Sequence, residues 1–194
     1  AAMTVGLGFG LQEIFANFVS GLILLFERPI RIGDTVTVGD ISGTISRIQI
    51  RATTITSWDR KELIIPNKEF VTGKVINWTL SDQSLRIVIP IGVAYGSDTA
   101  RVEWILRQVA GANSEVLKDP APQAFFVGFG ASSLDFELRV FTLGVDRLIS
   151  VKHALLNAID KAFRDAGIEI AFPQQDVHIR SVKDVFPVVQ KPGD

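Results

Sequence analysis

The first 26 residues of the chain are almost free of charge. Between Ala1 and Phe26 the only ionisable side chain belongs to Glu13, whereas charged residues make up 21% of the whole chain. The mean hydropathy of +0.29 is high for a soluble globular protein, and the excess lies in this stretch. The pattern therefore predicts a membrane-associated N-terminal segment followed, after Glu27, by globular domains of ordinary composition.

This apolar run differs from a signal peptide, because no basic start precedes it and no small-residue cleavage site follows it. The chain begins in mid-pattern with Ala1-Ala2 and has no initiator Met, so we expect it to be the C-terminal piece of a longer protein. The net charge of −1 offers no basic field for nucleic acid. The lack of cysteine excludes a disulfide framework and thiol-ligated metal sites.

Three glycines alternate within the run, at Gly6, Gly8 and Gly10. A dinucleotide-binding loop would need a strand before them, a helix after them and an acidic residue about 20 positions further on. Only a few residues precede these glycines, and residues 15–26 are too apolar for a crossover helix. We therefore favour a helix over a phosphate-binding loop.

On a helix, the small residues of this segment fall on two flanks: Ala2, Gly6 and Gly10 on one, Ala1 and Gly8 on the other. Small residues allow neighbouring helices to approach closely in a membrane, and two such flanks suit a ring of identical helices. Val5 and Phe9 lie between the flanks and would point at the axis of the ring, as in a pore. A simple membrane helix pair with an apolar knob between glycines fits the segment equally well.

From Ile14 onward the helix becomes two-sided. Large apolar residues cover one arc, and small or polar residues cover the other, with Leu24 as the only large apolar exception. Such a helix suits a position along a membrane face. We expect a break at Gln12-Glu13, where a polar pair follows glycines that each weaken a helix by about 1 kcal/mol relative to alanine. Arg28 and Arg31 then place the following chain on the cytoplasmic side.

After Pro29 the pattern changes to short strands separated by turn residues. The sequence predicts them near residues 35–38, 43–50, 52–57, 63–66 and 75–78. Five short strands in about 50 residues favour a small barrel of the SH3 or Sm type.

The third region predicts the order βαββαβ, which is the ferredoxin-like arrangement. Its strands are expected at residues 85–93, 124–129, 134–140 and 176–180. Gly96-Ser97-Asp98 offers capping groups for the first helix, and Gly167 suits the end of the second. Residues 183–194, with two prolines and Gly193, are expected to form a loose tail.

No residue pattern predicts an enzyme, a metal site or a cofactor. The two histidines, His153 and His178, have no partner at ligand spacing. Ser132-Ser133 lacks the flanking glycine of a nucleophile elbow. The basic residues of the predicted barrel are not interleaved with the aromatic residues that an RNA site needs, so we expect no nucleic-acid partner.

Three stretches resemble the small-conductance mechanosensitive channel (MscS) family: VGLGFGLQEIFANFVSGLILLFERPIRIGDTV, ATTITSWDRKELIIPNKEFVTGKVINW and GVAYGSD. The glycine-rich part with Gln12-Glu13 is most similar to the branch of the potassium-dependent channel MscK. The resemblance implies a homoheptamer in a bacterial inner membrane, with the last membrane helix of each subunit lining the pore. It also implies a hollow cytoplasmic vestibule, and membrane lipids and permeating ions as partners.

The resemblance also assigns roles to residues. Val5 and Phe9 match the apolar rings that close the pore, where well-known members carry leucines. Ala2, Gly6, Gly8 and Gly10 match the small residues on which pore helices slide. The remaining assignments are the kink (Gln12 and Glu13, with Glu13 replacing a glycine), the lateral helix (Asn17 and Gly21) and the membrane–barrel junction (Arg28 and Arg31).

These expectations divide the chain into four parts. Residues 1–27 form a pore-lining helix and an amphipathic lateral helix, residues 28–80 an Sm-like β-barrel domain, residues 81–182 a ferredoxin-like α/β domain, and residues 183–194 a tail. The predicted function is that of a mechanosensitive channel subunit, which membrane tension opens to release ions and small osmolytes during hypo-osmotic shock. The alternative is a membrane-anchored regulatory module that binds a ligand without conducting ions.

Overall fold

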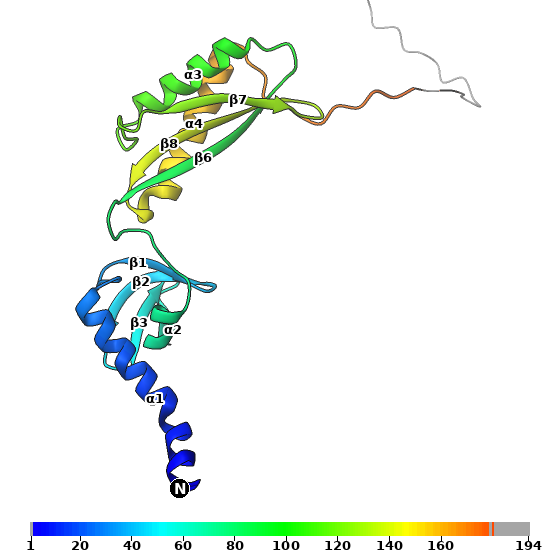
Figure 1. Cartoon of the computed structure of the whole chain (residues 1–194). Coiled ribbons are helices and arrows are strands. Elements are labelled where there is room, and N and C mark those ends of the chain that lie inside the picture. The colour runs from blue at the N-terminus through cyan, green and yellow to red at the C-terminus, as the bar shows by residue number, and fades with distance from the viewer. Residues whose placement is uncertain (1, 179, 181–194) are drawn as a thin grey trace, which may run out of the picture.

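The computed structural model describes residues 2–178 and 180, and the side chains from Gly6 onward. One long helix, α1 (Ala2–Glu27), leads into two units that follow each other along the molecule (Figure 1). Each unit has its own buried cluster of apolar side chains. The tail predicted for residues 183–194, and the side chains of Ala2 and Val5, lie outside the described part of the chain.

The first unit is a five-stranded antiparallel sheet of order β4-β3-β2-β1-β5. Its strands are β1 (Thr35–Val38), β2 (Ile41–Ile48), β3 (Ala52–Ser57), β4 (Glu62–Pro66) and β5 (Val75–Asn77). A register shift between Ile45 and Arg47 lets β2 bend around the core. Inward-facing Val36, Ile45 and Ile55 are at most 1% exposed and fill its centre. This confirms the strands expected between residues 35 and 78.

Helix α2 (Asn67–Thr72) connects β4 to β5 and was not predicted. Six residues are too few to show a helical period, and a helix this short depends on tertiary contacts. Phe70, which is 7% exposed, anchors α2 in the core of the sheet.

The second unit has a three-stranded sheet of order β6-β8-β7. Its elements are β6 (Ser84–Val93), α3 (Thr99–Ala112), β7 (Gln123–Phe129), β8 (Leu134–Leu143), the 3₁₀ turn η1 (Val145–Arg147) and α4 (Leu148–Ala166). Both α-helices lie on one face of the sheet (Figure 1), where their apolar stripes bury Leu106, Leu155 and Phe163. The predicted caps are confirmed: the Asp98 carboxylate accepts hydrogen bonds from the backbone N–H groups of residues 100 and 101, and Gly167 adopts a left-handed conformation.

The prediction of a strand at residues 176–180 is wrong for the residues that the structure describes there, because 176–178 and 180 belong to no strand. Among the residues that the structure describes, one isolated bridge reaches the outer edge of β6, where Ile170 pairs with Val93. The carbonyl oxygen of Gly92 accepts a hydrogen bond there from the N–H of Ala171 at 3.0 Å. The even-numbered residues of β6 therefore direct their backbone N–H and C=O groups to this edge. Pro90 is one of these residues and has no N–H to donate. On the opposite segment, Pro173 follows Ala171 by two residues and has no N–H either. Two prolines therefore end the pairing after one bridge.

Candidate pore helix and its anchor on the β-sheet unit

The N-terminal part of α1 extends away from the rest of the chain (Figure 1). All side chains from Gly6 to Ile14 are exposed, with Phe9 at 73% and Leu7 at 64%. A Cβ atom added to Gly6, Gly8 or Gly10 would meet no atom within 4 Å. The two glycine flanks and the intervening Phe9 thus form a smooth apolar surface that no described residue of the same chain covers.

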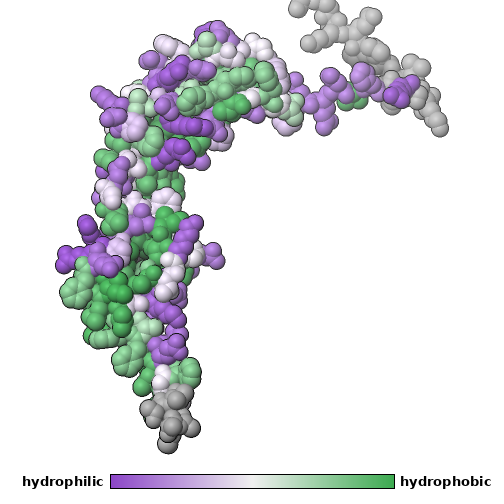
Figure 2. Space-filling model, viewed as in Figure 1, coloured by the Kyte–Doolittle hydropathy of each residue, from purple (hydrophilic) through white to green (hydrophobic). Residues whose placement is uncertain are grey.

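Residues Gly6–Glu27 have the length and composition of a membrane span, and only 17% of the most apolar 18 residues of this segment are buried. A core helix of a soluble domain with this composition would be mostly buried. The apolar surface of α1 forms a continuous region in the space-filling view (Figure 2). Its exposure argues for an apolar surrounding that lies outside the single chain.

The C-terminal part of α1 docks on the β-sheet unit through its small and polar side. Ser20 is 6% exposed, and Gly21 is buried. The large apolar residues of the opposite arc remain exposed: Ile14, Phe15, Phe18, Val19, Leu22, Leu25 and Phe26. This polarity is the reverse of that in a soluble amphipathic helix, and it matches a helix that has protein on one side and lipid on the other.

At Gly21 the helix approaches the β-sheet unit closely. A Cβ atom there would lie 2.7 Å from Nδ2 of Asn67, 3.0 Å from the carbonyl carbon of Ile50 and closer still to the Ile50 oxygen. Leu24 lies one turn further along the same side and is 1% exposed within the core of the β-sheet unit. The one residue that interrupts the small and polar side of the helix is therefore its apolar anchor.

Asn67 organises the surface against which Gly21 packs. Its fully buried amide donates to the carbonyl oxygens of Gln49 at 2.9 Å and Ile50 at 3.0 Å, and its Oδ1 accepts from the Thr53 hydroxyl at 2.8 Å. Every hydrogen bond in this set joins segments distant in sequence. Sequence reasoning missed Asn67, and its only signal was a polar residue directly after the apolar run of β4.

Asn17 and Lys68 connect the two helices. The Asn17 amide donates to the carbonyl oxygen of Glu13 at 2.8 Å and accepts from the backbone N–H of Lys68 at 3.0 Å. Residue Pro66, at the N-cap of α2, provides no side-chain cap, so Asn17 supplies that cap from another helix. The Lys68 ammonium also contacts both carboxylate oxygens of Glu13, at 2.9 and 3.1 Å.

The break expected at Gln12-Glu13 is not present, because α1 runs as one continuous helix from Ala2 to Glu27. Gln and Glu are good helix formers, and no proline interrupts this segment. The contacts with α2 nevertheless divide the helix at this point into a part that is held by α2 and a part that is not. Glu13 and Asn17 are tied to Lys68, whereas the side chains from Gly6 to Gln12 have no such partner among the described residues.

The end of α1 is sharply defined. The N–H of Arg28 bonds to the carbonyl oxygen of Leu24 at 3.2 Å, and Arg28 takes a φ of 52° that favours glycine. For a residue with a Cβ this left-handed conformation costs about 1 to 2 kcal/mol. The Asp34 carboxylate then closes the turn, accepting from the N–H of Arg31 at 2.9 Å and from the Asn77 amide at 2.7 Å.

The described residues contain no group of three His, Cys, Asp or Glu side chains able to hold a metal ion. His153 lies within 3.0 Å of the Asn157 amide on the exposed side of α4, and His178 is exposed. Hydrogen bonds from the hydroxyl and then the backbone N–H of Ser84 lower the pKa of Asp82, an exposed group before β6. This shift reflects a local cap rather than acid–base chemistry.

Two family models account for most of the chain. Residues 13–80 match "Mechanosensitive ion channel, beta-domain", and residues 87–170 match "Mechanosensitive ion channel MscS, C-terminal". The chain belongs to the MscS family of mechanosensitive ion channels. The predicted family is thereby confirmed, and it is a family of channels rather than of enzymes.

Relatives in this family include the mechanosensitive channel MscK of Escherichia coli, which is 55% identical over 184 residues. An uncharacterised MscS-family protein of Haemophilus influenzae is 55% identical over 181 residues, and the miniconductance channel MscM of E. coli is 46% identical over 182 residues. These matches cover 93 to 94% of this chain but 16% of each relative. The identities confirm the MscK branch.

The closed-state crystal structure of Helicobacter pylori MscS has the same fold, with a TM-score of 0.84 at 24% identity. The match covers 93% of this chain and 71% of that chain. An apolar helix followed by an Sm-like β-sheet unit and a ferredoxin-like α/β unit is therefore the common architecture.

Proposed function

We propose that this MscS-family chain supplies the pore-lining helix and the cytoplasmic domains of a tension-gated channel in a bacterial inner membrane. The observation that carries the proposal is the contrast within α1. Its C-terminal part is anchored through Gly21 and Leu24, whereas its N-terminal part presents Phe9 and three glycines that no described residue of the same chain covers. A surface of this kind requires neighbours, and identical helices are the simplest ones.

The glycines would let neighbouring copies of α1 pack closely around an axis. Phe9, and Val5 one turn before it, then face the lumen and form a narrow apolar constriction. Such a constriction blocks ions by excluding water, and it conducts when the ring widens. Membrane tension favours the wider state because that state occupies more area in the plane of the membrane. Ions and small osmolytes would then leave the cell after hypo-osmotic shock.

The β-sheet unit offers a way to assemble the ring. Among the described residues, β4 pairs only with β3 and β5 only with β1, so the two ends of the sheet are free. Ile64 on β4 is 73% exposed, and Ile76 on β5 is 42% exposed. Pairing β4 of one copy with β5 of the next gives a head-to-tail contact, which closes into a ring when the rotation between copies allows. The homoheptamer of the family resemblance is an arrangement of this type.

The contacts of Glu13 and Asn17 with Lys68 on α2 would convert ring opening into a defined movement of α1. Because Glu13 and Asn17 are tied to Lys68, widening the ring must tilt the free N-terminal part of α1 relative to a fixed C-terminal part. Gln12 and Glu13, which were expected to form a kink in the helix, lie at this boundary. We propose that the helix bends there during gating.

The full-length protein, purified and reconstituted in liposomes, tests this function by patch clamp. A ring of seven subunits with stretch-activated currents supports the proposal. A dimer without conductance would refute it and would favour the ligand-binding regulatory module instead. Enzymatic turnover is not expected, and neither is nucleic-acid binding.

A further inference from the structure

The outer edge of β6 is free along most of its length. The described chain pairs with this edge only near its end, where the carbonyl oxygen of Gly92 accepts a hydrogen bond from Ala171. A ferredoxin-like arrangement would place a fourth strand along the rest of the edge. The backbone N–H and C=O groups of Arg86 and Val88 point there, and they have no partner among the described residues.

A groove follows this free edge, between β6 and the neighbouring helix α4 (Figure 1). Its volume is about 540 Å³, and residues 86–88 of β6 form one wall. The other wall is an apolar strip of α4 that includes Ile149, which is 83% exposed, and Leu156, which is 43% exposed. Unpaired backbone groups beside exposed apolar side chains are the surface to which an extended peptide adds as an extra strand.

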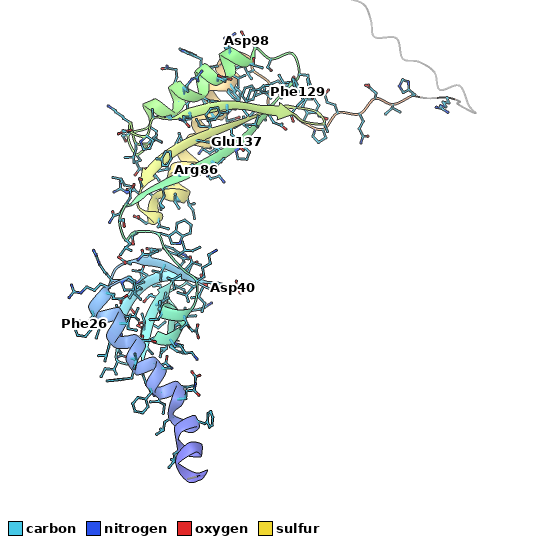
Figure 3. All side chains as sticks on the ribbon, viewed as in Figure 1. Phe26, Asp40, Arg86, Asp98, Phe129 and Glu137 are labelled. Carbon is cyan, nitrogen blue, oxygen red and sulfur yellow. The ribbon has the colours of Figure 1, made fainter. Side chains whose placement is uncertain are left out.

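The charged side chains around the groove are basic. Arg86 on β6 (Figure 3) and Lys152 on α4 are both exposed, and neither forms an ion pair with a carboxylate of the described residues. His153 lies beside them, with its ring 3.0 Å from the Asn157 amide. None of the described residues that line the groove is acidic. Charge complementarity therefore favours an acidic partner.

We propose that an acidic, extended peptide segment of another protein binds along β6 as an added strand. The backbone of Arg86 and Val88 offers this segment both donors and acceptors, whereas Pro90 ends the pairing because it has no N–H. Side chains of the added strand alternate between the two faces of the sheet. Those on the helix side would be apolar and contact Ile149 and Leu156, and those on the other side would be acidic and lie near Arg86.

The chain's own continuation is a poorer occupant of this edge. After Ala171 the chain turns away, and the N–H of Gln174 donates to the Ser132 hydroxyl at 3.2 Å. Residues 181–194 contain two lysines, two aspartates and two prolines, so they offer neither an acidic charge nor an uninterrupted strand. All residues of the groove belong to the second unit, so the site is separate from the proposed pore.

The test uses the purified full-length protein and a fluorescein-labelled peptide of about seven residues in which glutamate and valine alternate. Fluorescence anisotropy at low salt should show saturable binding. One comparison peptide carries lysine in place of glutamate, and a second carries N-methyl groups along its backbone, which remove its hydrogen-bond donors. Each should bind at least about tenfold more weakly, because each loses one of the two interactions that define the site.

A proline at residue 88 tests the backbone contact. Val88→Pro removes an outward N–H and leaves the pairing with β8 intact, and Pro90 shows that the strand accepts proline at an equivalent position. Binding should weaken about fivefold, which corresponds to the loss of one hydrogen bond. Val88→Ala keeps the N–H and is the matched control, which should bind as the wild type does.

Side-chain variants test the apolar strip and the charges. Ile149→Ser should weaken binding about tenfold, because the complex would bury this exposed side chain. Arg86→Gln and Lys152→Gln should each weaken binding about threefold at low salt and less at high salt. Arg101→Gln, which removes an exposed arginine on α3, is the matched control and should have no effect.

Several results would overturn the proposal. They are the absence of binding by the wild type, equal binding of the lysine or N-methylated peptide, and unchanged affinity in a folded Val88→Pro variant. Hydrogen–deuterium exchange without peptide provides a further test. Protection of the Arg86 and Val88 amides in the free protein would assign the edge to a neighbouring copy or to the chain's own tail, and would also refute a peptide partner.

Discussion

A methyl group at Gly21 would collide with the surface on which α1 rests. In Gly21→Ala the new Cβ would lie 2.7 Å from Nδ2 of Asn67 and 3.0 Å from the carbonyl carbon of Ile50, both well inside van der Waals contact. Neither neighbour is a flexible chain end, because one is backbone and the other is a buried amide with three hydrogen bonds. The helix must therefore lift off, or Asn67 must give up its bond to Ile50.

The size of the effect follows from these two contacts. A weakened buried hydrogen bond at Asn67 and partial exposure of Leu24 together cost about 3 kcal/mol. The higher helix propensity of alanine relative to glycine offsets about 1 kcal/mol of this cost. The net loss of about 2 kcal/mol corresponds to a roughly 30-fold increase in local opening of the anchor.

Hydrogen–deuterium exchange on the full-length protein measures this opening directly. Amide exchange in residues 20–28 should accelerate about 30-fold in Gly21→Ala. Gly111→Ala is the matched control, since Gly111 also lies in a helix but a Cβ there meets nothing within 4 Å. Its exchange in α3 should stay the same or slow down. Unchanged protection of residues 20–28 in Gly21→Ala would show that α1 is not held against Ile50, and the anchor described above would be refuted.

Further predictions concern the pore, the anchor and the ring. Phe9→Ser should make the channel leaky, seen as slow growth and a lowered tension threshold in patches; normal growth and threshold would argue against an apolar constriction. Gly8→Leu should raise the tension needed for opening by blocking close helix packing, and a wild-type threshold would count against the sliding surfaces. A double-mutant cycle of Glu13→Gln with Lys68→Gln should give a coupling of at most about 1 kcal/mol that falls with added salt, because both side chains are substantially exposed. A salt-independent coupling would contradict this surface ion pair. Ile64→Glu should shift the purified protein from rings to smaller species on size-exclusion chromatography, and an intact ring would argue against pairing through β4.

The regular elements were predictable where side-chain periodicity is strong. Strand β8 alternates strictly between buried and half-buried residues over nearly its full length, and α4 repeats its apolar residues at helical spacing, so local pattern and tertiary burial agree. The short helix α2 was missed because six residues show no period. The final strand was wrongly expected because the pairing register of β6 with its neighbours decides which of its backbone groups lie at the free edge. Only that register reveals that the backbone nitrogen of Pro90, which carries no hydrogen, lies at this edge.

The candidate site divides in the same way. An apolar run with a single charged residue, followed by two arginines, already predicted an apolar helix that ends at a basic junction, since composition and helical geometry are local properties. Tertiary structure decided which side of that helix meets protein. Leu24 looked like an exception and became the anchor, and Asn67 had no recognisable role until Gly21 was packed against it. Contacts of this kind depend on groups more than 20 residues apart, and only the folded chain brings those groups together.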